Sequence, residues 1–296
     1  GSVGQYGPLV HFGATMTEVL LKYIRIKIDR RVFIACGVAG AISAGFNAPI
    51  AGVLFAHEAL LRRISVGAIG PIAVTSIVAY AANQAFFTLE PMFSLPDMPI
   101  ELQPLIPFLI FTGVFSALTS VAYMAAIRKG RELATRSQWS MPKLLLSCVV
   151  VVGAIGVVVP DVAGLGLQQI NQMLDAQFGL GMLLVLLAGK IFVTAYCLNT
   201  GFFGGVFGPA LFVGAATGAV VAHVAILLGL APHLSYALPV AAIAAVGGAV
   251  IGAPLTAIMI VIELTGSYAY GLSAMLCAIL CSLLTLRFFG LSYFDR

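Results

Sequence analysis

Long apolar stretches follow one another along almost the whole of this 296-residue chain. A helix of about 20 residues spans the hydrocarbon core of a bilayer, and most of the stretches reach or approach that length. Glycine and proline break the longer stretches at Ala48-Pro49, Gly208-Pro209 and Ala253-Pro254. We therefore expect an all-α, polytopic membrane protein with tilted and broken helices. The stretches cover residues 8–28, 32–60, 66–87, 105–127, 144–159, 181–198, 207–230, 237–262 and 270–289.

The composition excludes a soluble protein. Apolar residues make up 61% of the chain and charged residues 9%, whereas a soluble fold has roughly a quarter of its residues charged. Most basic residues fall into clusters at 22–31, 62–63 and 128–143. The positive-inside rule places these clusters on the cytoplasmic side of a plasma or inner membrane. The net charge of +4 therefore reflects topology, and we expect no nucleic-acid partner.

Catalytic or metal chemistry is not indicated. The five cysteines lie scattered in apolar segments and are predicted to be small buried side chains. His11, His223 and His233 show no ligand spacing with one another. Gly1-Ser2-Val3-Gly4 superficially resembles a nucleophile turn, but no histidine stands at a recognisable spacing from it. We expect no enzyme activity, no metal and no cofactor other than a bound anion.

Two short blocks recur in the same order. Gly4-Gln5-Tyr6-Gly7-Pro8 matches Gly205-Val206-Phe207-Gly208-Pro209, and a Gly-Ala pair follows five residues after each proline. Further on, Ala48-Pro49 precedes Glu58 by the same distance that separates Ala253-Pro254 from Glu263. Many transporters are built from such repeats, often inverted, with the substrate held where helices of both halves break. We predict one transmembrane domain over 1–296, with repeats at about 1–127 and about 141–296.

Each glycine-rich turn predicts an anion site. The proline belongs just inside the start of a helix, and the glycines before it leave backbone N–H groups uncovered. A helix start carries about four unpaired N–H donors and roughly half a positive charge. Two such starts that meet within the bilayer would hold a small anion. Neither turn supplies an acidic side chain, which a cation would need.

At these residues the chain resembles the CLC family of chloride channels and proton-coupled chloride transporters. The resemblance rests on residues 4–8, 45–55, 204–209, 252–256 and 262–265 and covers essentially the whole chain. It implies an inverted-repeat bundle, a bound chloride and a homodimer with one pore in each subunit. We place the dimer interface at 50–55 and 255–262. The match begins at the family's sixth helix, so the serine that contacts the central anion in the family is absent from this sequence.

The resemblance also implies the pore residues. The backbone amides of Val206 and Phe207 would hold a central anion, and those of the first turn an outer one. The family's pore tyrosine aligns with Phe294, while Tyr293 lies one residue earlier. Whether one of these rings contacts the anion or both only pack stays open. The implied pore residues are Gly4, Gln5, Tyr6, Gly7, Gly205, Val206, Phe207, Gly208, Tyr293 and Phe294.

The chain departs from the family at both proton-carrying positions. Coupled exchange in the family needs a glutamate in the first turn, where this chain has Tyr6, and an inner glutamate, where it has Ala59. A phenol ionises only at about pH 10 and cannot replace a carboxylate that exchanges protons near neutrality. We therefore expect passive, proton-uncoupled transport of a small inorganic anion, most simply chloride, with Tyr6 as the gate.

Several alternatives stay open. His57 and Glu58 could substitute for the lost proton path and give a coupled antiporter, or they could be a helix-end pair that reaches cytoplasmic water. Glu263 is expected to be a buried hydrogen-bonding or interface group. Lys190 lies inside an apolar stretch and could attract anions or pair with a carbonyl or an acid. A non-conducting, CLC-like scaffold plugged by Tyr6 is the remaining reading.

Overall fold

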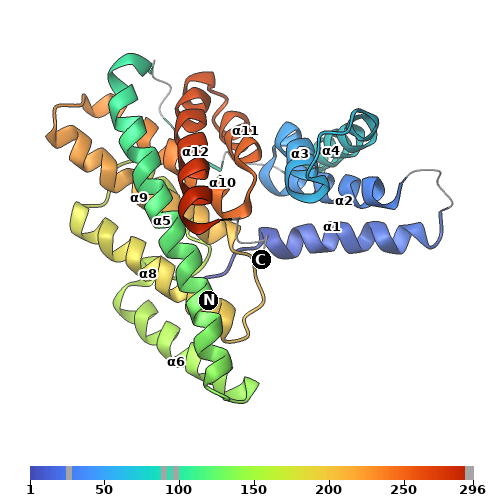
Figure 1. Ribbon diagram of the computed structural model, residues 1–296, viewed down its shortest axis with the longest axis horizontal. Coiled ribbons are helices and arrows are strands. Elements are labelled where there is room, and N and C mark those ends of the chain that lie inside the picture. The colour runs from blue at the N-terminus through green and yellow to red at the C-terminus, as the bar shows by residue number, and fades with distance from the viewer. Residues whose placement is uncertain (25–28, 88–91, 94, 96–99, 291–296) are drawn as a thin grey trace.

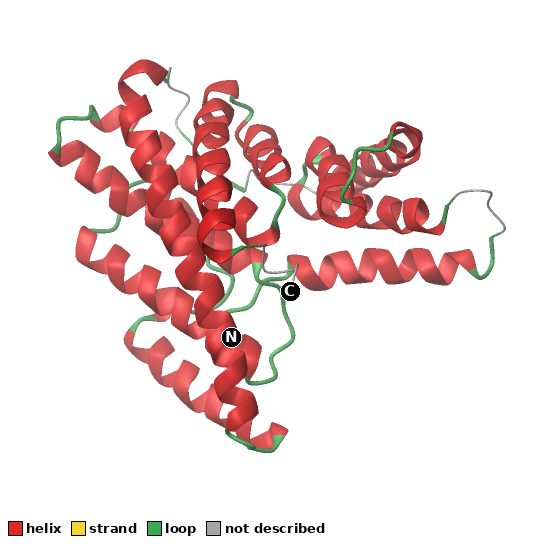
Figure 2. Cartoon of the chain, viewed as in Figure 1, coloured by secondary structure: helices red, strands yellow, loops and turns green. Residues whose placement is uncertain are grey.

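A computed structural model describes residues 1–24, 29–87, 92–93, 95 and 100–290. These residues are helical throughout, apart from connecting turns and one isolated β-bridge (Figures 1 and 2). A π-helical turn, η1 (Ala56–Leu61), continues α3, and two 3₁₀ turns are η2 (Pro160–Val162) and η3 (Pro232–Leu234). The α-helices are α1 (Tyr6–Leu21), α2 (Arg30–Phe46), α3 (Pro49–Phe55), α4 (Val66–Phe86), α5 (Leu102–Arg136), α6 (Met141–Val158), α7 (Leu167–Leu174), α8 (Leu180–Asn199), α9 (Phe207–Leu227), α10 (Ala237–Ile251), α11 (Pro254–Thr265) and α12 (Tyr268–Phe289).

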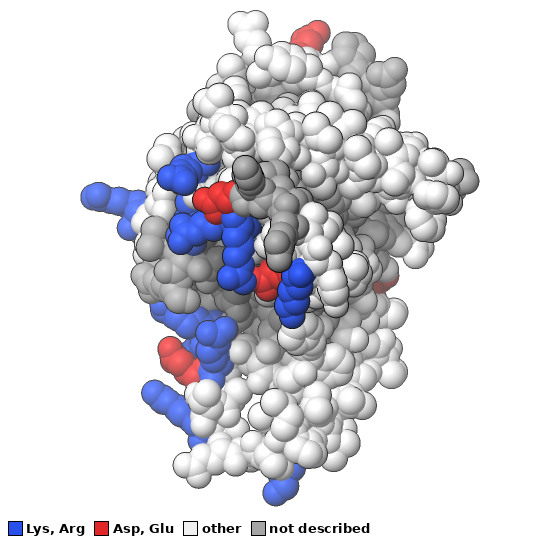
Figure 3. Space-filling model, turned by 90° about the vertical axis from the view of Figure 1, so that its right-hand side faces the viewer, with Lys and Arg blue, Asp and Glu red and all other residues white. Residues whose placement is uncertain are grey.

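The all-α membrane fold predicted from the sequence is confirmed. Seven helices in the described part of the chain are long and apolar enough to cross a bilayer, and α3 with η1 and α11 are shorter apolar helices. On α4, α6 and other outer helices, large apolar side chains such as Val74 and Val157 are exposed, as lipid contact requires. Lys and Arg gather toward the left of the face shown in Figure 3. The protein is therefore a multi-pass integral membrane protein.

The core lies in the second half of the chain. In the membrane span Pro232–Ile251, which contains α10, 94% of the residues are buried, and in the α9 span 78% are buried. In the α6 span only 6% are buried. Helices α5, α8 and α12 pack around this pair, while α1 to α4 extend to the right of the bundle in Figure 1. The beginning of α1 lies against the bundle, and the rest of that helix runs outward (Figure 1). The five cysteines are all buried, as predicted.

The two predicted Ala-Pro breaks adopt the same backbone geometry. α2 ends at Asn47 and α10 ends at Gly252, both in the left-handed region with φ of 55° and 70°. Ala48 and Ala253 then adopt nearly the same conformation, with φ of −134° and −135° and ψ of 83° and 67°, and Pro49 and Pro254 begin α3 and α11, where a missing N–H costs nothing. Pro209, by contrast, interrupts no helix, because it lies in the first turn of α9.

The short helix α7 (Leu167–Leu174) was missed by the sequence analysis. It is amphipathic, with Ile170, Met173 and Leu174 buried toward α9 and polar side chains on the other face. A search for apolar stretches of membrane-spanning length passes over a helix this short. Its alternation of Leu, Ile and Met with Gln and Asn was the signal available.

Two glutamates connect the repeated blocks reciprocally. Glu58 in η1 accepts hydrogen bonds from the N–H groups of Leu255 and Thr256 at 3.0 and 2.8 Å, and from the Thr256 hydroxyl at 2.8 Å. Glu263 in α11 accepts from the N–H groups of Ile50 and Ala51 at 2.8 and 2.7 Å. Each carboxylate thus caps the helix that begins the other block. A negative charge at a helix start is stabilised by the unpaired donors and the helix dipole.

We expect Glu263→Ala to destabilise the protein by about 2 kcal/mol, since two N–H groups lose charged acceptors away from bulk water. The melting temperature in detergent should fall clearly. Glu18→Ala is the matched control, because Glu18 forms an exposed ion pair with Arg30 whose side chains are 46% and 73% accessible. Such surface pairs contribute about 0 to 1 kcal/mol. Equal melting temperatures for the two variants would contradict the capping role.

Candidate anion-binding site

The two glycine-rich turns pair with each other through their backbones. The N–H of Gly4 donates to the carbonyl of Gly205, and the N–H of Gly205 donates to the carbonyl of Gly4, both at 2.7 Å. This is the isolated antiparallel bridge of the fold. Two repeat-related segments, far apart in the chain, therefore lie side by side.

The pairing brings the starts of α1 and α9 together. Gln5 and Val206 precede these helices with nearly identical conformations, φ −84° and ψ −21° against φ −84° and ψ −20°, and neither side chain caps its helix. The N–H groups of the first turn have no acceptor within their own helix. Two positive helix ends without any acidic residue thus converge at one place, a setting that suits an anion.

Only glycine permits this approach. A Cβ on Gly205 would lie 2.7 Å from the backbone nitrogen of Gly7, and one on Gly4 would lie 2.9 Å from the carbonyl oxygen of Gly205. Heavy-atom contacts this short with backbone atoms cannot be relieved by moving a side chain. The glycines of both turns are therefore needed for the helix starts to meet.

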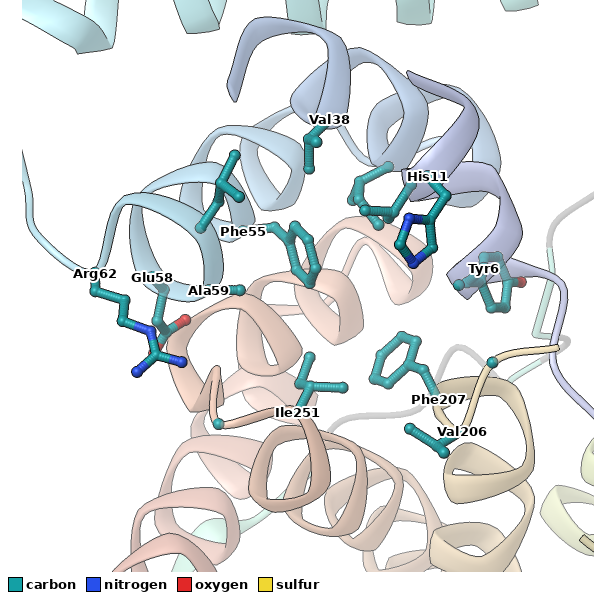
Figure 4. Close-up of a pocket in the computed structure, with 16 residues that line it drawn as sticks. Tyr6, His11, Val38, Phe55, Glu58, Ala59, Arg62, Val206, Phe207 and Ile251 are labelled. Atoms are coloured by element: carbon teal, nitrogen blue, oxygen red, sulfur yellow. The ribbon is translucent and has the colours of Figure 1, made fainter. Parts of the chain in front are cut away.

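Tyr6 is part of a packed aromatic group. Its ring is 3% exposed and stacks on Phe46, with centroids 3.8 Å apart, and meets Phe207 edge to face at 6.0 Å. Its hydroxyl donates to the sulfur of Met92 at 3.8 Å and points away from the neighbouring cavity (Figure 4). The ring, rather than the hydroxyl, therefore occupies the space beside the paired turns.

Tyr123 was not singled out by the sequence analysis, yet it supports the second turn. The side chain is fully buried on α5, and its hydroxyl donates to the carbonyl of Val206 at 2.9 Å. This bond fixes the residue that begins α9. One polar group inside an apolar membrane helix was the only available signal.

A cavity of about 460 Å³ extends from the paired turns to η1. Tyr6, Val206 and Phe207 border it at one end, and Glu58 and Arg62 lie at the other (Figure 4). Apolar side chains of α1, α2, α3 and α10 line the space between these two ends. The cavity thus connects the two helix starts to a charged rim.

The residues considered for the proton path separate in the structure. Ala59 and Glu58 line the cavity, whereas His57 is not among its lining residues in the described part of the chain. The expectation that His57 reaches water is wrong, since it is 4% exposed. Its Nδ1 lies 2.9 Å from the carbonyl of Val53, and its buried Nε2 has no hydrogen-bond partner among the described residues. Glu58 and Glu263 both serve as the caps described above.

Lys190 pairs with carbonyls and does not face the cavity. Its ammonium donates to the carbonyls of Val162 and Gly164 at 3.1 and 2.9 Å and lies over the Phe212 ring at 4.4 Å. The amine is fully buried and anchors the turn before α7 to α8 and α9. Tyr293 and Phe294, the two candidates for the pore tyrosine, lie outside the described residues.

The fold and the paired turns define a multi-pass membrane protein with an anion-favouring site between repeated helix starts. The voltage gated chloride channel family matches residues 1–286. The chain therefore belongs to this family, as the resemblance to CLC proteins predicted.

Known proteins share both sequence and fold with the chain. It is 30% identical over 287 residues to a putative chloride channel protein, ClcB-like, of Ralstonia nicotianae, covering 94% of this chain and 66% of that protein. It is 31% identical over 279 residues to the H(+)/Cl(-) exchange transporter ClcA of Vibrio cholerae, covering 90% of this chain and 59% of the transporter. The chain thus spans somewhat less than two thirds of the length of these relatives.

Two solved structures share the fold. A slow cyanobacterial Cl-/H+ antiporter superposes with a TM-score of 0.86 at 20% identity, covering 99% of this chain and 70% of that chain. A CLC-type fluoride/proton antiporter superposes with a TM-score of 0.83 at 21% identity, covering 100% and 72%.

The expectation of passive, proton-uncoupled transport is contradicted by these relatives. The ClcA proteins of Vibrio species are exchange transporters that carry protons as well as chloride. The sequence analysis inferred uncoupling from the absence of two glutamates alone. The coupled antiporter that the sequence analysis left open as an alternative is better supported by these relatives.

We propose that the Tyr6 ring obstructs the anion path, and we expect Tyr6→Leu to raise the chloride flux into proteoliposomes severalfold. Leucine removes the stacked ring but still fills part of the core, so the fold should survive. Tyr6→Phe is the matched control and should leave the flux within about twofold, because the hydroxyl that it lacks is directed to Met92. If both variants lose flux equally, the hydroxyl is an anion ligand and the gating role is wrong.

Proposed function

We propose that this protein exchanges a small inorganic anion, chloride in the first instance, for protons across the membrane. The observation that carries the proposal is the pairing of Gly4 with Gly205, which places two helix starts against one small volume. Backbone N–H groups there can replace the hydration shell of an anion without any fixed positive side chain. A neutral cradle of this kind binds an anion and also releases it, as transport requires.

Proton coupling is supported by the exchange transporters among the relatives. In this chain the coupling has to operate without carboxylates at positions 6 and 59. The proton therefore needs another titratable group along the anion path. The cavity between the paired turns and η1 is the place where such a group can meet water and the anion in turn.

We also propose that the protein works as a homodimer. Ile50 and Leu255 occupy corresponding positions after the two Ala-Pro breaks and are 53% and 50% exposed on adjoining helices. The reciprocal glutamate caps align α3 and α11 into one apolar face.

The antiport proposal predicts that an outward chloride gradient drives protons into proteoliposomes against a proton gradient. An external pH electrode and a chloride electrode, read together, give the ratio of the two fluxes. A chloride flux that moves no protons would contradict exchange.

Gly205→Ala tests the anion site in the same assay. The added methyl group would force the paired turns apart, so both fluxes should fall by about tenfold or more, as expected when a short backbone contact cannot relax. Gly153→Ala on α6 is the control, since a Cβ there meets nothing within 4 Å. Unchanged transport by Gly205→Ala would place the anion elsewhere.

For the dimer, we expect Ile50→Cys to cross-link between subunits with a bifunctional maleimide in membranes. The native cysteines are buried and should react slowly. Val78→Cys is the control, because Val78 on α4 is 61% exposed but lies outside the proposed interface. This variant should not cross-link between subunits. Equal cross-linking at both positions, or at neither, would contradict an interface on α3 and α11.

A further inference from the structure

His11 lies inside the cavity that leads to the paired turns. It belongs to α1, which begins at Tyr6, and its ring points into the cavity between Tyr6 and Phe55 (Figure 4). An imidazole is the side chain that changes its charge between about pH 5 and 8 without special surroundings. The sequence analysis considered His11 only as a metal ligand.

The other ionisable groups that border the cavity in the described residues are Tyr6, Glu58 and Arg62. The elements α2, α3, α9 and α10 contribute only apolar side chains and glycine to its lining, such as Ile42, Phe55 and Ile251. Tyr6 directs its hydroxyl away, to Met92. A guanidinium cannot give up its proton under ordinary conditions, so Arg62 cannot carry one.

Glu58 is committed as a cap. Its two oxygens accept three hydrogen bonds at the start of α11, and a proton on the carboxylate would displace one of these donors. His57, on the same turn, does not line the cavity and holds Nδ1 against the carbonyl of Val53. His57 therefore does not face the anion path, and Glu58 faces it but is held by its three hydrogen bonds at the start of α11.

We infer that His11 is the residue that takes up and releases the proton during exchange. The inference rests on the proposed antiport function and names the group that this function requires. It assigns to His11 a role that Tyr6 and Ala59 cannot fill in this chain.

The proton step needs no co-reactant other than water. A hydronium ion that enters the cavity from the Glu58 and Arg62 end protonates the neutral His11 ring, giving imidazolium and a water molecule. When water enters beside Tyr6, the imidazolium returns the proton to it and becomes neutral again.

The test compares His11→Gln with the unmodified protein in proteoliposomes, with both electrodes. Glutamine keeps the size and polarity of the side chain and removes the titration. Chloride flux should persist within about twofold, while the number of protons moved per chloride should fall by tenfold or more. Because His11 is exposed, the variant should elute as the unmodified protein does in size-exclusion chromatography. His11→Asn is the second variant if it does not.

His223→Gln and His57→Gln are the controls. His223 lies on α9 with Nδ1 3.1 Å from the carbonyl of Ala219, away from the cavity. Both controls should keep the flux ratio of the unmodified protein. Loss of coupling in His57→Gln but not in His11→Gln would overturn the assignment.

The remaining outcomes are distinct. An unchanged flux ratio in His11→Gln and His11→Asn would overturn the assignment and leave antiport standing. A parallel fall of both fluxes would make His11 part of the anion path instead of a proton carrier. Absence of proton movement in the unmodified protein would overturn the proposed function, and the inference with it.

Discussion

Two backbone hydrogen bonds between Gly4 and Gly205 hold together the beginnings of helices that are separated by most of the chain. They are possible only because neither residue carries a side chain. Everything of functional interest is arranged around them: the two helix dipoles, the aromatic group of Tyr6, Phe46 and Phe207, and the near end of the cavity. A site made of backbone supplies no ionisable ligand of its own to the anion.

The same repeat produces a second kind of contact at Glu58 and Glu263. Here a carboxylate from each half accepts hydrogen bonds from the first N–H groups of a half-helix in the other half. Inside a bilayer no water can accept hydrogen bonds from the N–H groups of an uncapped helix start. Such caps therefore stabilise a membrane helix more than a helix on a water-exposed surface. A glutamate inside a transport protein is a natural candidate for a proton carrier. Both of these side chains, however, are engaged as helix caps.

The sequence predicted the membrane fold, the Ala-Pro breaks and the two anion-favouring turns, because proline and glycine fix backbone conformation locally. It could not predict that the Tyr6 hydroxyl turns toward Met92, and it left open whether Lys190 attracts anions or pairs with a carbonyl, since both depend on which helices meet. His11 and Tyr123 were missed for the same reason. Each is one of several polar residues on its helix, and only the packing shows that one faces a cavity and the other a turn.

The reciprocal caps also bear on how the chain is made. Ile50 and Ala51 obtain their acceptor from Glu263, a residue more than 200 positions later in synthesis. The half-helix that begins at Pro49 therefore cannot obtain this cap until Glu263 has been synthesised and inserted. A chain that ends between the two copies would lack the acceptor for these N–H groups, so the first copy depends on the second for a complete helix start.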